Sequence, residues 1–442
     1  MSGIEIDLKE NLRVISLHHH VVIIGGGFGG LYAAKELGNR QGIKATLIDK
    51  RNFHLFQPLL YQVATGGLSP GDIASPLRGI TSGYKNIEVL CDEMTGIDPE
   101  NRLIRMKSEQ INYDFLILAT GMQNYYFNHA TWPEFAPGLK TIEDALEMRR
   151  RIFLAFEEAE KTTNIPVRDM LMRFVVIGGG PTGVELAGAL GELALRTLKR
   201  DFRRINTGMS KIYLLEGGEK ILPMYPDHLV DSAMLSLKKL GVHIHTGAKV
   251  ISISDTRIKY EQHGQEHEIN AGTILWAAGV RPTGLNKTFA EKTGAGTDKM
   301  GRIIVSGDCS VPGYPEIFVI GDAACFLDET GRALPGVSPV AMQQGKYVAR
   351  TIIRRLQNKP IQPFSYRDKG SLAVIGRNAA IANFRLLRMH GFIAWLIWVF
   401  VHIGYLIEFD NKLIVMTQWA WNYVTRKKGA RLITETARNT NS

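Results

Sequence analysis

The feature that most constrains this chain is a glycine-rich turn that directly follows four β-branched residues near the N-terminus. The apolar run is VVII (residues 21–24), and the turn is GGGFGG (residues 25–30). Gly25, Gly27 and Gly30 match a dinucleotide-binding fingerprint, in which the first glycine permits a tight turn, the second admits a pyrophosphate and the third lets helix and strand pack closely. The pattern predicts a buried strand followed by a helix whose positive end faces phosphate.

The residues after the turn complete a strand–helix–strand unit. A helix is expected from Leu31 to about Gly38, followed by a strand over residues 44–48 that ends in Asp49. Asp49 lies nineteen residues after Gly30, which is about the spacing at which an acidic side chain hydrogen-bonds a ribose hydroxyl group. A flexible glycine turn without a ligand is the alternative, but the complete unit favours a bound dinucleotide.

The same pattern occurs again about 150 residues later. FVVI (residues 174–177) leads into GGGPTG (residues 178–183), a helix is expected from Val184, and a strand over residues 211–215 ends in Glu216. Two units predict two dinucleotides. Their separation favours a flavin domain interrupted by a nicotinamide domain, because solenoid repeats are only about 20–50 residues long. The alternative is a decayed second copy that binds nothing.

Glu216 bears on the choice of cofactor in the second unit. A carboxylate at this position accepts a hydrogen bond from the 2′-hydroxyl group of NADH and repels the 2′-phosphate of NADPH. Lys220 lies nearby, so a positive charge is also within reach. The pattern favours NADH, and a solvated charge at the strand end is the alternative.

Turns of small residues follow a strand in each unit. A strand predicted over residues 113–118 ends in ATG (residues 119–121), and AAG (residues 277–279) is its counterpart. Such turns let the chain cross between two nested domains, and residues 143–161 form a charged helical connector. Later, a strand over residues 317–320 leads to Asp322, which can meet the ribityl chain of a flavin.

Composition and cysteine spacing exclude several classes. The chain has 442 residues, enough for two or three domains, and its three cysteines lack metal-ligand or CxxC spacing, which argues against a disulfide framework. Residues 50–70 contain no cysteine, although flavoprotein disulfide reductases carry their redox pair there, so electrons must leave a flavin to another acceptor. Residues 1–17 lack the apolar core of a signal peptide. No metal site is expected, because the three adjacent histidines at 18–20 cannot point the same way along a strand.

The C-terminal region is apolar and aromatic. Residues 392–407 (FIAWLIWVFVHIGYLI) number sixteen, fewer than the ~20 that span a bilayer. A second aromatic segment, residues 413–424, precedes RKKGAR (residues 426–431), and four of the six tryptophans lie in this region. Tryptophan prefers the headgroup layer, and basic residues add about 1 kcal/mol each against anionic lipid. The region predicts a monotopic anchor, with a buried helix or a dimer contact as the alternatives.

Several segments together resemble the type II NADH dehydrogenases, single-subunit NADH:quinone oxidoreductases that do not pump protons. The discriminating segments are HLFQPLLYQ (residues 54–62), IGD (320–322), AMQQ (341–344), GSLAVIGR (370–377) and the aromatic C-terminus. The resemblance extends from Val21 to about Arg431, whereas the glycine fingerprints belong to a wider superfamily. It implies FAD on the first unit, NADH on the second, and a quinone that reaches the flavin from the membrane side.

The resemblance also implies three catalytic residues. Glu185 would lie near the flavin in a network for protons and quinone, and Gln343 and Gln344 would border the quinone and the flavin. From the residues alone, the alternatives for Glu185 are a helix-surface charge and a carboxylate favoured by the helix dipole, but its position in the motif favours the functional role. The chain carries Pro339 where some members have an extra glutamine.

The predicted fold is α/β, with two Rossmann-like dinucleotide-binding domains as in flavoproteins that bind two dinucleotides, plus an amphipathic C-terminal helical segment that anchors the chain to a membrane. The FAD domain is expected at 1–139 and 286–385, the NADH domain at 140–285, and the anchor at 386–442. The residues expected to bind FAD are Gly25, Gly26, Gly27, Phe28, Gly29, Gly30, Asp49, Lys50, Gln57, Met94, Ala119, Thr120, Gly121, Asp322, Ala341 and Gln343. Those expected to bind NADH are Gly178, Gly180, Pro181, Thr182, Gly183, Glu185, Glu216, Ala278 and Gly279.

The predicted reaction has two halves: hydride passes from NADH to flavin N5, and the reduced flavin then reduces a membrane quinone. The expected location is the cytoplasmic face of the inner membrane, with a homodimer as a further expected partner. Nucleic acid is not expected, because no recognition element accompanies the net charge of +10. The alternatives are a soluble NADH-dependent reductase of a ferredoxin or small acceptor, and a flavin-binding membrane sensor without turnover. Sulfide:quinone oxidoreductases share the architecture but rely on cysteines near the flavin.

Overall fold

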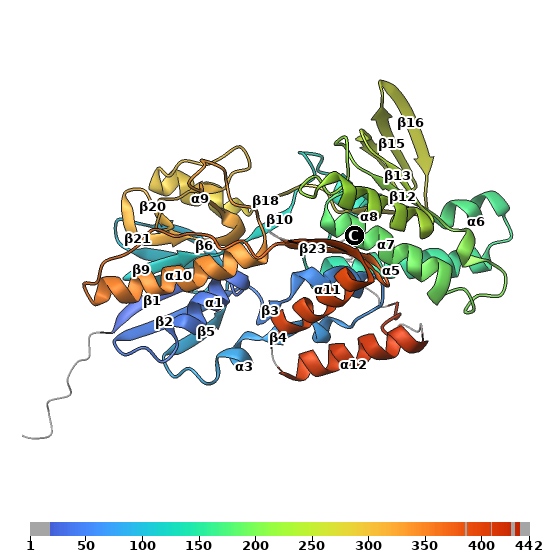
Figure 1. The fold of residues 1–442 in the computed structure, drawn as a ribbon. Helices are drawn as coiled ribbons and strands as arrows, with labels where there is room; N and C mark the ends of the chain where they lie inside the picture. Colours follow the sequence, from blue (N-terminus) through green and yellow to red (C-terminus); the bar gives the residue numbers. More distant parts are fainter. Residues whose placement is uncertain (1–17, 385–386, 408, 426–428, 434–442) are drawn as a thin grey trace, which may run out of the picture. The chain divides into compact units, whose positions relative to one another are not determined.

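The computed structural model describes residues 18–384, 387–407, 409–425 and 429–433 (Figure 1). The N-terminal stretch of 1–17 and the basic residues 426–428 lie outside the described residues, and so do the predictions that rest on them. The chain forms two compact units: a first unit of Met1–His54, Leu77–Gly121 and Pro282–Tyr366, and a second unit of Leu55–Pro76, Met122–Arg281 and Arg367–Ser442. Each unit contains one glycine fingerprint and one sheet of four or more strands.

The first unit is built on a six-stranded sheet with the order β20-β21-β9-β1-β2-β5, parallel except for β20. The strand β1 (His19–Ile24) is buried through its second half, as expected for a strand covered on both faces. The other elements are α1 (Phe28–Leu37), β2 (Ile43–Asp49), α3 (Leu77–Thr81), β5 (Ile87–Cys91), β6 (Met94–Asp98), β7 (Leu103–Met106), β8 (Gln110–Asn112), β9 (Phe115–Leu118), α9 (Gly284–Thr293), β19 (Ile303–Ile304), β20 (Ser310–Val311), β21 (Tyr314–Val319), η5 (Gly321–Ala323), β22 (Ala324–Cys325) and α10 (Ser338–Leu356).

The second unit contains a four-stranded parallel sheet with the order β13-β12-β11-β17. Two antiparallel sheets, β14-β15-β16 and β23-β24-β25, complete it. Its elements are η1 (Gln57–Leu59), α2 (Leu60–Ala64), η2 (Pro70–Asp72), β4 (Ala74–Pro76), β10 (Met122–Asn124), α4 (Trp132–Phe135), α5 (Ile142–Lys161), α6 (Ile165–Leu171), β11 (Arg173–Ile177), α7 (Pro181–Glu192), η3 (Leu193–Thr197), η4 (Thr207–Met209), β12 (Lys211–Leu215), α8 (Asp227–Lys239), β13 (Val242–His245), β14 (Lys249–Ile253), β15 (Arg257–Gln262), β16 (Gln265–Asn270), β17 (Thr273–Trp276), β23 (Ser371–Gly376), β24 (Ala379–Asn383), β25 (Arg388–Gly391), α11 (Phe392–Tyr405) and α12 (Phe409–Thr425). The short strands β3 (Phe53–Leu55) and β18 (Val280–Pro282) lie at the boundaries of the two units.

The predicted α/β class and both strand–helix–strand units are confirmed, with shifted helix starts. The helices begin at Phe28 and Pro181, three residues earlier than expected in each case. The reason is that the last fingerprint residues already adopt helical backbone, and proline fits the first turn of a helix because it has no N–H to leave unpaired. The helical connector is confirmed as α5, whose start is capped by the Thr141 side chain and Asp144.

The compact units do not follow the predicted domain limits. They group Leu55–Pro76 and Arg367–Ser442 with the second fingerprint. A predicted domain is the part of the chain that binds one cofactor, whereas a compact unit is a part whose residues pack mainly on one another. The two need not coincide, so the domain boundaries remain a prediction.

The C-terminal helices expose apolar side chains. The helix α11 packs on the β23-β24-β25 sheet and buries Ala394 and Trp398. Its other face is open, since Ile393 is 62% exposed and Phe400 is 70% exposed. A buried core helix is therefore excluded for α11. Within the described parts of the chain, we find no helix with both the length and the apolar content that a membrane span requires.

Candidate functional site

The first fingerprint forms an open cradle at the start of α1. Gly25 has a φ of +105°, and a Cβ there would meet the Ala119 carbonyl oxygen at 2.3 Å. A Cβ at Gly30 would lie 1.9 Å from the Gly25 oxygen, whereas one at Gly27 would meet no described residue within 4 Å apart from its neighbours in the chain. No side chain caps the start of α1. The turn, the close packing and the open approach expected of the three glycines are all present, so the cradle fits a pyrophosphate.

Asp49 holds the middle of this turn. Its Oδ2 accepts a hydrogen bond from the Gly26 N–H at 2.6 Å, and its Oδ1 accepts one from the Arg51 N–H at 2.8 Å. Burial raises the pKa of Asp49, and the two backbone hydrogen bonds oppose that rise. The carboxylate therefore lies at the carboxyl end of β2, where a ribose hydroxyl group is expected.

His54 also contacts the cradle, although it was noted only as part of a segment. Its Nδ1 lies 2.9 Å from the Gly26 carbonyl oxygen, and its ring stands edge-on to Phe28 with centroids 5.0 Å apart. Burial lowers the pKa of His54 to about 4, so the ring is neutral and Nδ1–H donates. Its buried Nε2 has no hydrogen-bond partner among the described residues.

Gln344 positions the turn that carries Asp322. Its side chain is 1% exposed, and its Oε1 accepts a hydrogen bond from the Gly321 N–H at 2.7 Å. A Cβ at Gly345 would meet the Gly29 carbonyl oxygen at 2.2 Å, so α10 packs directly on the backbone of α1. Gln344 thus has a structural contact within the first unit, and the predicted contacts of Gln343 and Gln344 with flavin or quinone stay predictions.

The second fingerprint repeats the geometry of the first. Gly178 has a φ of +107°, and a Cβ on Gly183 would lie 1.8 Å from the Gly178 oxygen. The position of Gly180 is open, and no side chain caps the start of α7. At Gly279 (φ +68°) a Cβ would meet the Tyr125 oxygen at 2.7 Å. The expected turn at 277–279 thus packs against the backbone at Tyr125, at a distance that leaves no room for a side chain on Gly279.

Glu216 plays the part in the second cradle that Asp49 plays in the first. Its Oε2 accepts a hydrogen bond from the Gly179 N–H at 2.5 Å, and its Oε1 accepts one from the Gly218 N–H at 2.6 Å. Lys220 pairs with Asp227 at 2.7 Å between Nζ and Oδ1. The nearby positive charge therefore has an acidic partner, which supports NADH over NADPH.

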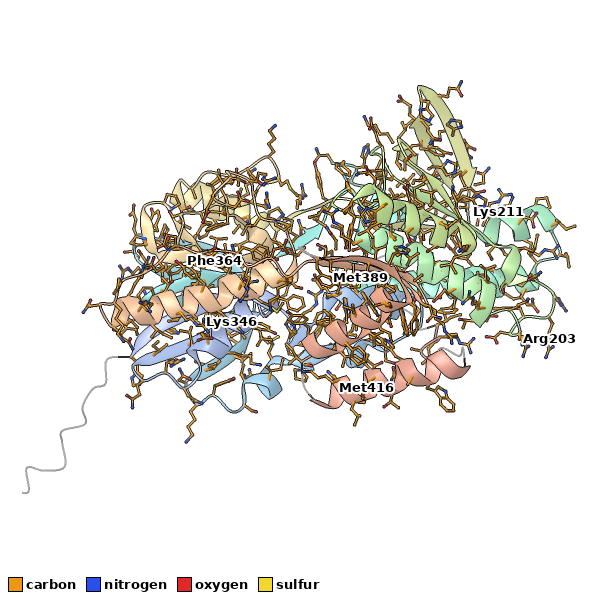
Figure 2. The ribbon with its side chains drawn as sticks, in the orientation of Figure 1. Arg203, Lys211, Lys346, Phe364, Met389 and Met416 are labelled. Carbon is orange, nitrogen blue, oxygen red and sulfur yellow. The ribbon has the colours of Figure 1, made fainter. Side chains whose placement is uncertain are left out.

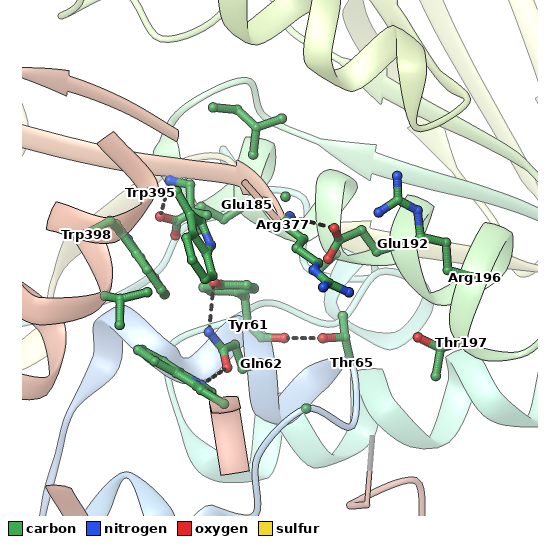
Figure 3. A pocket seen from close by; sticks show the side chains of 17 residues that line it. Tyr61, Gln62, Thr65, Glu185, Glu192, Arg196, Thr197, Arg377, Trp395 and Trp398 are labelled. Atoms are coloured by element: carbon green, nitrogen blue, oxygen red, sulfur yellow. Dashed lines mark hydrogen bonds between the residues drawn. The ribbon is translucent and has the colours of Figure 1, made fainter. Parts of the chain in front are cut away.

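A pocket of about 160 Å³ lies within the second unit (Figure 3). Its apolar lining includes Trp395, Trp398 and Trp419 from α11 and α12, and Trp398 stacks on Trp419 with centroids 5.1 Å apart. Ala189, Val374, Ile375 and Val399 also line it. The polar side chains that line it are Tyr61, Gln62, Thr65, Glu185, Glu192, Arg196, Thr197 and Arg377. A flat aromatic wall with a few convergent polar groups suits a planar apolar ligand that carries polar atoms.

Gln62 connects the tryptophan wall to Tyr61. Its Oε1 accepts a hydrogen bond from Trp419 Nε1 at 2.9 Å, and its Nε2 donates to the Tyr61 hydroxyl oxygen at 3.0 Å. An indole N–H can only donate, so the amide of Gln62 is fixed in this orientation and the Tyr61 O–H is left to donate elsewhere. Burial and then the charge of Glu185 raise the pKa of Tyr61 well above its ordinary value, so the hydroxyl group keeps its proton.

Glu185 is an acid that stays protonated at neutral pH. The side chain reaches the pocket but is surrounded by protein, and burial raises its pKa to about 8, against the opposing hydrogen bond from the Val374 N–H at 3.4 Å. Figure 3 shows Glu185 on the same pocket as Tyr61. The pocket thus holds two protonated groups, the Glu185 carboxyl group and the Tyr61 hydroxyl group, and the carboxyl group is the stronger acid.

The structure places the expected site residues in three groups. The residues expected to bind FAD lie in the first unit, except Gln57, whose Nε2 donates to the Lys140 carbonyl oxygen at 3.4 Å in the second unit. All residues expected to bind NADH lie in the second unit. Glu185 lines the pocket, whereas Gln343 and Gln344 do not.

Sequence reasoning missed Tyr61, Gln62, Arg377 and the individual tryptophans as pocket residues. The signal that could have found them was the two distinctive segments at 54–62 and 370–377.

Comparison with known proteins gives consistent matches. A family model described as pyridine nucleotide-disulphide oxidoreductase matches residues 19–345, and one described as NDH2 C-terminal domain matches residues 369–427. The chain is 41% identical to the type II NADH:quinone oxidoreductase Ndh of Mycobacterium tuberculosis, over 94% of this chain and 90% of that protein. It is also 41% identical to NdhA of the same organism, over 94% of this chain and 89% of that protein.

Solved structures show the same fold. NDH2 from Plasmodium falciparum in complex with NADH matches with a TM-score of 0.86 at 20% identity, over 94% of this chain and 100% of that chain. A sulfide:quinone oxidoreductase from Aquifex aeolicus matches with a TM-score of 0.69 at 20% identity, over 95% and 93% of the two chains.

Proposed function

The chain belongs to the type II NADH:quinone oxidoreductases, and from this membership we propose that it uses FAD in the first cradle, NADH in the second and the tryptophan-walled pocket for the quinone. The activity is the oxidation of NADH with reduction of a quinone. FAD, when bound, accepts hydride from NADH and passes two electrons to the acceptor.

The residues of the chain position the two dinucleotides. In the first cradle Asp49 and the open start of α1 would hold the ribose and pyrophosphate of FAD, and Asp322 would hold its ribityl chain. In the second cradle Glu216 would accept from the adenosine ribose of NADH while Gly180 admits the pyrophosphate. Both cradles use backbone N–H groups and a helix start, which suit phosphate.

The observation that carries the quinone assignment is the pocket that combines three tryptophans with the protonated Glu185. A quinone is planar and apolar, carries two carbonyl oxygens, and takes up two protons when two electrons reduce it. The tryptophans would stack on the ring and exclude water, and Glu185 would supply a proton to a quinone oxygen. The Tyr61 hydroxyl group would donate a hydrogen bond to the same ligand.

The exposed apolar faces of α11 and α12 support peripheral attachment to a membrane. The location that we propose is the cytoplasmic face of the inner membrane. A quinone dissolved in the bilayer would then reach the pocket through the tryptophan wall. The same faces suit contact with a second copy of the chain, and light scattering in detergent would detect such a homodimer.

The test follows flavin absorbance without oxygen. NADH should bleach the flavin, a short-chain quinone should restore its absorbance rapidly, and NADPH in parallel should bleach it much more slowly. Bleaching without recovery on quinone would overturn the assignment of the acceptor. Absence of flavin from the purified protein would overturn the assignment of the first cradle.

A further inference from the structure

A strongly basic segment follows α7 in the second unit. We call residues 196–204 the basic segment. It contains five basic residues and one acidic residue, Asp201. The basic residues, all of them exposed, are Arg196, Lys199, Arg200, Arg203 and Arg204. This segment lies far in sequence from the C-terminus, so it is a second source of the net charge of +10.

The basic side chains of the basic segment have little acidic compensation among the described residues: the charge of Arg204 acts on the Glu160 carboxylate, but without a close ion pair. None of its five basic side chains forms an ion pair within the part of the chain that the structure describes. The two adjacent acids have other contacts: Asp201 pairs with Arg431, and the Glu160 carboxylate accepts hydrogen bonds from the backbone N–H groups of residues 203, 204 and 205 at 2.9–3.1 Å. Glu160 thus fixes the backbone of the segment and forms no close ion pair with its guanidinium groups, although it feels the charge of Arg204. The side chains of Lys199, Arg200 and Arg203 remain available to an external anion.

The basic segment borders the pocket and the C-terminal helices. The ion pair between Asp201 and Arg431 ties it to the chain that follows α12. Arg196 lines the same pocket as Trp398 and Trp419. Figure 2 shows Arg203 and Met416 of α12 toward the lower part of the view, with Lys211 above them. Unpaired cations therefore flank the helices that expose apolar side chains.

We propose that the basic segment binds the anionic headgroups of phospholipids while the apolar side chains of α11 and α12 enter the acyl layer. The inference rests on the proposed function, in which this face meets a membrane. Cations beside exposed apolar side chains match an anionic bilayer, whose surface attracts lysine and arginine and whose interior accepts the apolar groups. A nucleic acid would match the cations but would leave side chains such as Phe400, which is 70% exposed, without a partner.

The test compares two full-length holoenzyme variants with the same loss of charge. The test variant combines Lys199→Gln, Arg200→Gln, Arg203→Gln and Arg204→Gln, none of which lines the pocket. The control combines Lys211→Gln, Lys238→Gln, Lys239→Gln and Lys249→Gln, which are exposed positions of the same unit. Binding is measured by flotation with vesicles of phosphatidylcholine alone and of phosphatidylcholine mixed with phosphatidylglycerol.

The test variant should lose binding to the phosphatidylglycerol vesicles by about 10- to 100-fold, because each basic side chain at an anionic surface contributes about fivefold and not all four reach the headgroups. The control should bind within about threefold of the unchanged protein. Both variants should keep their flavin content, their melting temperature and their activity with a water-soluble quinone, so the failure of this inference is distinct from a failure of the proposed function.

Two outcomes would overturn the inference. One is equal loss of vesicle binding in both variants, which would mean that only the total charge matters. The other is unchanged binding of the test variant to the phosphatidylglycerol vesicles. If that variant also lost binding to a DNA duplex, the segment would be assigned to nucleic acid.

Discussion

Replacing Glu185 with glutamine removes a pocket carboxyl group whose pKa burial raises to about 8. The rise from the ordinary value of 4.5 means that the folded protein disfavours the ionised form by about 5 kcal/mol. At pH 7 the group is therefore about nine-tenths protonated and able to donate, and above pH 8 its protonated fraction falls tenfold per pH unit. Glutamine keeps the shape but has no acidic proton.

The assay mixes reduced enzyme with a short-chain quinone in a stopped-flow instrument and follows flavin reoxidation across a pH range that spans the inflection. The unchanged enzyme should react at a constant rate below about pH 8 and more slowly above it. Glu185→Gln should be slower by about 100-fold at pH 7, because general acid catalysis contributes about 10²–10⁴-fold, and its rate should not change with pH. An inflection near pH 8 in both proteins would refute the assignment of the proton donor.

A matched variant and a second readout sharpen the test. The matched variant is Glu192→Gln, which makes the same change in the same pocket. Glu192 accepts a hydrogen bond from the backbone N–H of Arg377 at 2.5 Å. This variant should keep the inflection of the reoxidation rate near pH 8. Bleaching by NADH should keep its rate in Glu185→Gln, and a slower bleaching step would place Glu185 at the nicotinamide instead.

The pH dependence of the free energy of unfolding tests the raised pKa of Glu185 independently of activity. The folded pKa lies above the unfolded one, so the unchanged enzyme loses stability as pH rises from about 4.5 to about 8, by about 1.4 kcal/mol per pH unit. As pH rises over that range, the melting temperature of Glu185→Gln should therefore increase relative to that of the unchanged enzyme. A difference that does not grow with pH would contradict the buried, protonated acid.

Three further substitutions probe the cradles and the pocket. Gly183→Ala forces a Cβ to within 1.8 Å of the Gly178 oxygen. We therefore expect the purified variant to keep its flavin, but NADH should not bleach that flavin. Normal bleaching would contradict this packing argument. Glu216→Gln weakens two hydrogen bonds from backbone N–H groups to a charged acceptor, worth about 1.5–3 kcal/mol each, and steady-state kinetics should show a KM for NADH at least about tenfold higher with an unchanged KM for quinone. Trp419→Phe keeps the stacking surface but removes the donor to Gln62, so the KM for quinone should rise about fivefold, and an unchanged value would mean that this hydrogen bond does not order the pocket.

The two cradles could be predicted because their geometry is local. Gly25, Gly30 and Asp49 lie within a single strand–helix–strand unit, and steric contacts that only glycine permits leave a visible pattern. The same reasoning misplaced the helix starts by three residues, since the fingerprint does not mark where helical backbone begins.

The pocket could not be predicted, because its contacts join distant parts of the chain. Gln62 and Trp419 are 357 positions apart, and no periodicity links them. The raised pKa of Glu185 likewise depends on what surrounds it after folding. Gln344 shows that a residue in a distinctive segment can also have a structural contact, because its amide oxygen accepts a hydrogen bond from the Gly321 N–H. Its contact with a ligand remains a prediction.

In both cradles a carboxylate of the chain holds the glycine that directly follows the first fingerprint glycine, Asp49 at Gly26 and Glu216 at Gly179. The turn is thus ordered in its binding shape without help from a ligand. The conformational entropy of that turn is lost once, when the chain folds, and not again in each binding event. In the proposed function NADH enters and leaves the second cradle in every catalytic cycle, and a turn that is ordered beforehand would let the substrate exchange as fast as its own contacts form and break.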